Sequence, residues 1–243
     1  MKIKRHFFIL LFFMIYSAVL FGQKNEFKFW NTLEYGMKIN NKWKVDFSQH
    51  MRLKENLSAV DNYITQFNVA FNPWKRWKLS TQIRYYRDND NEGINQGFDN
   101  LFRYRIGIEK QFKINPGIFN IRLAYQDRLS LDRSRFSNSQ DWLVYGKRTK
   151  KVIRLKSSFE WKIKNWSYDP IFSFEYLPET RPNVKTFSFY STRYGLGTNI
   201  KVSKTHRVSI RYFYEMSKYI KSEYFSSAHV ISLKYMFRNV KKK

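Results

Sequence analysis

Apolar and polar residues alternate along most of the chain. Between residues 42 and 54, one set of alternate positions holds Trp43, Val45, Phe47, Met51 and Leu53. The positions between them carry Lys, Asp, Ser, His and Arg side chains. A period of two places the two sets on opposite faces of a β-strand. This stretch therefore predicts a strand with one oily face and one charged face, and both faces need suitable surroundings.

The same period recurs to the end of the chain, and no segment with a helical period competes with it. Eleven such segments stand out, at residues 27–39, 43–53, 63–71, 77–85, 102–112, 119–125, 153–163, 172–176, 190–202, 208–214 and 231–237. Short polar connections alternate with longer ones. The short connections are residues 40–41, 72–76, 114–117, 164–165 and 203–206, and the long ones are 55–62, 87–98, 132–149, 178–187 and 218–227. This rhythm is typical of an up-and-down sheet whose two ends differ.

The length of the segments distinguishes two architectures. A soluble sandwich or lipocalin-like barrel would bury the apolar faces, but strands in soluble folds average about 5–6 residues. The segments here run to about 10–14 residues, whereas a strand that crosses a membrane needs about 9–11. Lipid outside the wall would suit the apolar face, and a water-filled lumen inside would suit the charged face. Only a closed barrel leaves no strand edge with unpaired backbone groups in lipid.

The predicted fold is therefore all-β: a closed antiparallel up-and-down transmembrane β-barrel of ten to twelve strands. Twelve strands are preferred, because bacterial barrels usually have an even number of strands and both termini in the periplasm. Asp127 falls on the apolar face of its segment. We expect a β-bulge there, since a bulge shifts the register of a strand.

Aromatic residues gather at the two ends of the predicted strands. Tyr and Trp favour membrane interfaces because their rings are amphipathic, so two such bands are typical of an outer-membrane barrel. The band at the short turns comprises Trp43, Trp74, Trp77, Phe112, Phe119, Trp161 and Trp166, and the band at the long loops comprises Tyr63, Tyr85, Phe98, Tyr176, Tyr190, Tyr214 and Tyr224.

The N-terminus predicts export. A basic start with Lys2, Lys4 and Arg5 precedes a continuous apolar run at residues 7–21. This pattern is typical of a secretory signal peptide, and the run is shorter than the roughly 20 residues of a spanning helix, the alternative interpretation. We expect cleavage near Gly22, so residues 1–22 form the signal peptide and residues 23–243 the barrel domain.

Composition adds two constraints. The chain has no cysteine, which excludes disulfides and thiolate chemistry. Loss of residues 1–22 removes three basic residues from a net charge of +26 and leaves +23. Such an excess favours anionic partners, among them the phosphate-bearing head groups of lipopolysaccharide. Export makes nucleic acid the least expected of them.

Three stretches resemble a known family. They are the opening hairpin at residues 29–53 (FWNTLEYGMKINNKWKVDFSQHMRL), the strand at 121–133 (IRLAYQDRLSLDR) and the closing segment at 229–238 (HVISLKYMFR). These stretches are similar to domain-of-unknown-function family 2490, predicted outer-membrane barrels common in Bacteroidetes-type bacteria. The resemblance implies a barrel and a compartment, and it implies no catalytic residues. Tyr235 and Phe237 match the aromatic ending that the outer-membrane insertion machinery recognises.

The polar faces carry a candidate cluster of charges inside the barrel. Its members are Arg84, Arg103, Arg105, Arg122, Arg128, Arg154, Arg193, Arg211, Glu34, Asp46, Glu109, Glu160, Glu175 and Glu215. One hypothesis is a structural plug of ion pairs, and the other is an anion-selective path. Barrels of eight strands are filled by side chains, and barrels of sixteen strands leave a channel. A barrel of ten to twelve strands lies between these cases, and long arginine side chains would fill most of its bore, so the plug is favoured.

Catalytic and metal sites find little support in the sequence. Ser48 and His50 share the polar face, and His229 lies on the apolar face with no evident orienting partner, so the nucleophile–base–orienter arrangement is not apparent. The spacing of Asp88, Asp90 and Glu92 before Gly93 is similar to a calcium loop, but the twelfth position holds Asp and no helices flank it. We expect no catalytic, cofactor-binding or metal-binding residues.

The sequence therefore predicts a barrel of the bacterial outer membrane, most simply a non-enzymatic envelope or accessory protein with a charge-filled lumen. A narrow pore for small anions is the first alternative, and a membrane-embedded lipid hydrolase or acyltransferase is the second. The expected partners are outer-membrane lipids and the insertion machinery, with small anions in the pore alternative. The sequence names no oligomeric state.

Overall fold

The structure is a computed structural model that describes most of the chain after residue 24. Its described residues are 25–91, 96–131, 133–136, 142–145, 148–166, 168–180, 187–219 and 225–239, with the backbone alone at 133–136, 142–145, 148, 188 and 219. The predicted signal peptide at residues 1–22 lies outside them. Among the described residues, no helix is long and apolar enough to cross a membrane.

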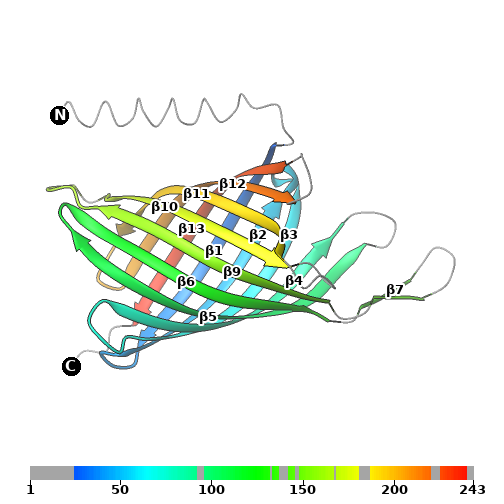
Figure 1. Cartoon of the computed structure of the whole chain (residues 1–243), viewed down its shortest axis with the longest axis horizontal. Coiled ribbons are helices and arrows are strands. Elements are labelled where there is room, and N and C mark those ends of the chain that lie inside the picture. The colour runs from blue at the N-terminus through cyan, green and yellow to red at the C-terminus, as the bar shows by residue number, and fades with distance from the viewer. Residues whose placement is uncertain are drawn as a thin grey trace.

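Eleven long strands form one closed barrel (Figure 1). Around the wall the strands follow the order β1-β13-β12-β11-β10-β9-β6-β5-β4-β3-β2. Their bounds are Asn25–Lys38 (β1), Trp43–Lys54 (β2), Ala59–Phe71 (β3), Trp77–Asp90 (β4), Gly97–Ile114 (β5), Gly117–Ser130 (β6), Arg148–Trp161 (β9), Pro170–Thr180 (β10), Phe187–Lys201 (β11), His206–Tyr219 (β12) and Phe225–Asn239 (β13).

The connections have the predicted rhythm, and they define two ends of the barrel. We call the end with residues 39–42, 72–76, 115–116, 162–169 and 202–205 the turn end, and the opposite end the loop end. At the loop end, a short 3₁₀ turn (Glu55–Leu57) joins β2 to β3. The long connection between β6 and β9 contains a two-stranded hairpin of its own, β7 (Arg133–Phe136) with β8 (Trp142–Tyr145). This hairpin extends beyond the wall (Figure 1).

The number of strands corrects one detail of the prediction. Eleven lies within the expected ten to twelve, but the preference for twelve was wrong. An odd number of up-and-down strands leaves the first and the last running in the same direction. The barrel therefore closes through a parallel pair, β1 with β13, in register from Asn25↔Ser227 to Met37↔Asn239. As a result, β1 begins at the loop end and β13 finishes at the turn end.

The alternation of the sequence separates the two faces of the wall. Apolar side chains stand on the outer face, where Ile106 is 59% exposed and Leu33 is 58% exposed. Polar side chains stand on the inner face, where Ser48 is 1% exposed and Glu175 is 3% exposed. The barrel is thus apolar outside and polar inside, the reverse of a soluble domain.

The bulge predicted at Asp127 is absent. Its strand pairs without interruption on both sides, with Tyr104↔Asp127 and Asp127↔Lys151 in register. Asp127 stays on the outer face, three residues from the loop end of β6, where a cation is its neighbour in the next strand. The described register shifts lie elsewhere, one at Arg52/Leu53 and one at Glu179/Thr180.

The aromatic residues meet across neighbouring strands at both ends. Near the turn end, the ring centroids of Trp43 and Phe71 are 4.5 Å apart. Near the loop end, those of Tyr176 and Tyr190 are 6.2 Å apart. Such cross-strand aromatic pairs stabilise a sheet, so the two bands also help to fix the register of the wall. Tyr224 lies outside the described residues.

Candidate functional site: the barrel interior

A row of charged residues crosses seven neighbouring strands of the inner face, from β4 to β12, and its charge alternates except where Arg122 faces Lys156. Each member is the register partner of the next: Lys78, Glu109, Arg122, Lys156, Glu175, Arg193 and Glu215. Opposite charges directly across a strand pair attract, and like charges repel. The period of two in each strand and the register between strands therefore build this row together. We call it the paired row.

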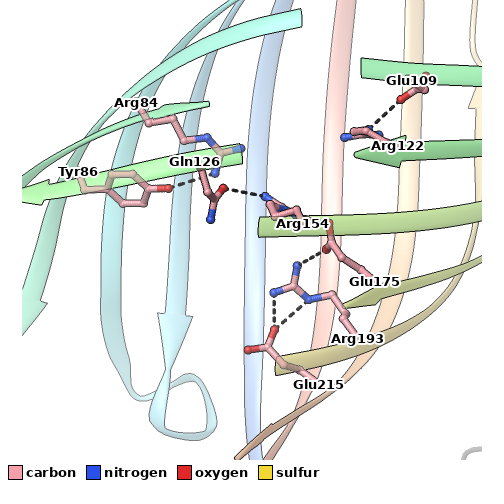
Figure 2. A network of polar contacts seen from close by, with 9 residues as sticks. All are labelled: Arg84, Tyr86, Glu109, Arg122, Gln126, Arg154, Glu175, Arg193 and Glu215. Atoms are coloured by element: carbon pink, nitrogen blue, oxygen red, sulfur yellow. Dashed lines mark hydrogen bonds and ion pairs between the residues drawn. The ribbon is translucent and has the colours of Figure 1, made fainter. Parts of the chain in front are cut away.

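Glu175, the fifth member of the paired row, lies between Arg154 and Arg193 (Figure 2). Its Oε1 accepts hydrogen bonds from Arg154 Nε at 3.0 Å and Nη2 at 2.5 Å, and its Oε2 accepts one from Arg193 Nη1 at 3.1 Å. Arg193 Nε also donates to Glu215 Oε2 at 2.9 Å. One buried carboxylate thus holds two guanidinium groups, and a second carboxylate completes the cluster.

A similar bridge lies at the other side of the row. Glu109 accepts a hydrogen bond from Arg122 Nε at 2.8 Å and forms an ion pair with Lys78 Nζ at 2.9 Å. Elsewhere on the inner face, Lys234 Nζ lies 2.5 Å from Glu34 Oε2, and Asn68 Nδ2 donates to Asp46 Oδ2 at 3.1 Å. Carboxylates of the interior are therefore held by cations or amides.

A second row is cationic along its length, and we call it the arginine row. Its members are register neighbours in β4, β5, β6 and β9: Arg84, Arg103, Arg128 and Lys150. Arg84 Nε donates to Gln66 Oε1 at 2.5 Å, and Arg128 forms an ion pair with Asp88. Arg103 Nε and Nη2 are buried and have no hydrogen-bond partner among the described residues. Like charges face one another here, which costs stability.

Aromatic side chains also enter the interior. The ring centroids of Trp30 and Phe213 are 6.0 Å apart, and the Arg52 guanidinium lies 4.3 Å from the centroid of the Trp30 ring. Arg193 lies 5.0 Å from the same ring. The ring of Phe213 lies against Gly195, where an added Cβ would come within 2.8 Å of it. Glycine at that position therefore gives the ring its space.

The interior encloses a cavity of about 520 Å³, which we call the chamber. Its wall reaches from Trp30 and Leu177, nearer the loop end, to Arg207 and Arg238. Both of these arginines lie one residue from the turn-end limit of their strands. Ten lining side chains are Arg or Lys and none is Asp or Glu. The cations are Arg52, Arg84, Arg103, Arg154, Lys156, Arg193, Arg207, Arg211, Lys234 and Arg238.

Towards the loop end, the inner face carries apolar residues among its polar ones. Six buried side chains, each three to five residues from the loop-end limit of its strand, form a layer that we call the collar. Its members are Ile64, Tyr86, Leu101, Val152, Leu177 and Val230. Ile64 and Val230 are 0% exposed, so neighbours surround them on every side. Apolar side chains therefore pack the bore on this side of the chamber.

The structure brings some of the predicted charges together and separates others. Arg154, Glu175, Arg193 and Glu215 form one cluster, and Arg122 with Glu109 forms another. Glu160 instead pairs with Lys162 beside the turn end, at 2.5 Å, and Asp46 pairs with Lys44. Arg211 donates to Ser209 at 3.3 Å, while the Nε of Arg105 is buried without a described partner.

Sequence reasoning missed the collar and the interior aromatics. It assigned the inner face to polar residues, and so passed over Trp30, Tyr86 and Phe213 together with the aliphatic members of the collar. A signal was present: each of these apolar residues stands at a polar position of the alternation. These apolar residues at polar positions also lie nearer the loop-end limits of their strands. A comparison of such positions between the predicted strands would have revealed this layer.

The residues considered for catalysis or metal binding contact other side chains of the barrel. His50 Nδ1 lies 2.9 Å from Thr32 Oγ1, and His50 Nε2 lies 3.1 Å from Ser48 Oγ, a hydroxyl that is almost fully buried. His229 Nδ1 lies 2.7 Å from the Tyr212 hydroxyl. In the part of the calcium-like stretch that is described, Asp88 pairs with Arg128, while Glu92 and Gly93 fall outside. No group of three metal-ligating side chains occurs within the described residues.

The family comparison agrees with the resemblance found in the sequence. A family model described as "Protein of unknown function (DUF2490)" matches residues 27–225, which is most of the barrel. Among curated proteins, none matches this chain.

Proposed function

This chain belongs to the DUF2490 family, and we propose that it is a non-enzymatic barrel of the bacterial outer membrane with a charge-filled lumen. The observation that carries the proposal is the inversion of the two faces. Leu33, Ile83 and Ile106 are more than half exposed on the outer face, while carboxylates and amides are buried on the inner face. Apolar area exposed to water costs about 25 cal/mol per Å². An apolar outer face around the whole barrel is therefore more stable in contact with lipid than with water.

Two further features support a membrane position. The closed barrel satisfies its backbone hydrogen bonds around the whole wall, as lipid requires. The aromatic bands stand at both ends of the strands, where the head groups of a bilayer would lie. Anionic head groups, such as those of lipopolysaccharide, suit a mature chain of net charge +23 after loss of three basic residues from +26.

Fractionation of cells that express the full chain tests the proposal. We expect the mature protein in the outer-membrane fraction, with an N-terminus near Gln23. The unheated protein should migrate faster in a detergent gel than the boiled one, because a closed barrel resists the detergent. Recovery in the soluble periplasmic fraction would contradict the membrane assignment.

The chamber favours a second candidate, a narrow pore that prefers small anions. A ring of one charge sign selects counter-ions, and the lining here is cationic. The collar argues for a closed lumen and against free passage. For the lipid-modifying alternative we find less support, since the Ser48 hydroxyl lies on the inner face and is buried.

A further inference from the structure

We propose that the chamber is a binding site for a multivalent anion rich in hydrogen-bond acceptors, of the phosphate or oligophosphate class, and that the anion enters from the turn end. The inference rests on the proposed function only for the compartment that supplies the ligand. The site itself is argued from the charges, the hydrogen-bond donors and the shape of the chamber.

The charge of the chamber is unbalanced. Arg154, Arg193 and Lys234 pair with Glu175, Glu215 or Glu34, as described above. The other seven lining cations form no ion pair with a carboxylate of the described residues. Cations confined in this way repel one another, and a buried charge without a counter-charge is costly. A bound polyanion would offset this cost.

The unsatisfied polar atoms of the lining indicate the chemistry of the ligand. Buried atoms without a hydrogen-bond partner among the described residues are Trp30 Nε1, Arg52 Nε, Arg103 Nε and Nη2, and Arg238 Nε. Every one of them is a donor. Buried donors require acceptors, so the ligand must bring several acceptors into the chamber. Phosphate oxygens are acceptors, and one guanidinium group can donate two parallel hydrogen bonds to two oxygens of the same phosphate.

The size of the chamber suits a small molecule. Pockets for small ligands commonly measure about 300–1,000 Å³, and the chamber measures about 520 Å³. Side chains from opposite parts of the wall line it, such as Arg52 from β2 and Arg154 from β9. A compact anion can therefore be contacted from several directions at once.

The shape of the interior sets the direction of access. The collar fills the bore towards the loop end, where Ile64 and Val230 are fully buried. In the other direction, the lining continues to Arg207 and Arg238 beside the turns. In an outer-membrane barrel the short turns face the periplasm. The ligand would then come from the periplasmic side and would not pass through.

Binding of pyrophosphate to the purified full chain in detergent tests this inference. The measurements are isothermal titration calorimetry and thermal unfolding, at an ionic strength held constant with sodium chloride. We expect saturable binding and a rise of the unfolding temperature, because a ligand that binds only the folded state stabilises it. Inorganic phosphate should bind more weakly, and chloride alone should not reproduce the effect.

Arg103→Gln distinguishes a ligand site from a structural cluster. It should weaken pyrophosphate binding about ten- to hundredfold, the usual size of a lost charge-assisted hydrogen bond. Without pyrophosphate it should raise the unfolding temperature, because it removes an unpaired buried cation. Arg238→Gln, at the turn-end limit, should weaken binding as well. Arg87→Gln is the matched control, since Arg87 is exposed on the outer face of the same wall and lies 5.0 Å from the Phe98 ring.

Three results would overturn the inference: pyrophosphate binding no stronger than that of chloride, no loss of binding in Arg103→Gln, or an equal loss in Arg87→Gln. The test of the binding site is independent of the test of the proposed function. A protein that binds pyrophosphate but is recovered from the periplasm would refute the membrane assignment and keep the site.

Discussion

At the scale of single residues, the interior depends on a few carboxylates that each hold more than one cation. Glu175 contacts Arg154 and Arg193, and it is almost fully buried. Such a pair is favourable only while both charges are present, since each has lost its water. Glu160 forms an ion pair of similar length with Lys162, but that pair stands beside the turn end and is partly exposed. The two glutamates therefore differ in what their loss would cost.

We predict that Glu175→Gln lowers the free energy of unfolding by about 3–5 kcal/mol, the usual cost of leaving a buried charge without its partner. Glu160→Gln, the matched control, should cost less than about 1 kcal/mol, as is usual for a solvent-exposed pair. Urea unfolding in detergent measures both variants. Equal effects would mean that the cluster around Glu175 is solvated and contributes little.

At the scale of elements, six of the eleven wall strands contribute two layers to the interior. These strands, β3, β4, β5, β9, β10 and β13, carry one collar residue near the loop end and polar or charged side chains nearer the turn end. Ile64, Tyr86 and Leu101 come from three consecutive strands, β3, β4 and β5, and pack into one cluster. Apolar side chains need no partner in the bore, so they fill it without the cost of desolvated charge. The collar and the ion pairs therefore both fill parts of the bore.

We predict that the wild-type protein conducts little in a planar bilayer and that Ile64→Ala opens a leak. The substitution should also cost about 2–5 kcal/mol of stability, as truncation of a buried Ile does. The leak should prefer chloride, because the chamber beneath is cationic. Ile83→Ala is the control with the same chemistry on the outer face, where the side chain is exposed. Steady cation-preferring currents from the wild type would contradict this account of the interior.

At the scale of the whole molecule, the odd number of strands separates the two ends of the chain. β1 starts at the loop end, where Glu55 N donates to Glu26 Oε1 at 2.8 Å and Phe27 N donates to Asn56 Oδ1 at 2.9 Å. The short turn between β2 and β3 thus holds the start of β1 in place. β13 finishes at the turn end. In a membrane, the two ends would lie on opposite sides.

We predict that an epitope tag at the mature N-terminus is accessible on intact cells, because β1 starts at the loop end. A tag after the last residue should become accessible only when the outer membrane is permeabilised. A tag at residues 137–140, between β7 and β8, is the positive control for the cell surface, and one at 115–116 is the negative control. Protection of both terminal tags would indicate an even number of wall strands and refute the parallel closure.

The sequence alone was sufficient for the class of fold, the two faces of the wall and the rhythm of its connections. These properties are local, because the period of two assigns every residue of a strand to a face, whatever strand lies beside it. The same rule found the charged residues of the interior, such as Glu175 and Arg193. It also placed Asp127 on the outer face, where the structure keeps it without the expected bulge.

Only the tertiary structure decided which charges are partners, how the barrel closes and where the interior is filled. Register between strands makes Glu175 the neighbour of Arg193 and leaves Arg103 beside Arg84, and no spacing along one strand contains that information. The parallel closure follows from the count of eleven, which a preference for even numbers obscured. The collar and the chamber arise because residues distant in sequence, such as Ile64 and Val230, reach the same depth of the bore only when the wall is closed.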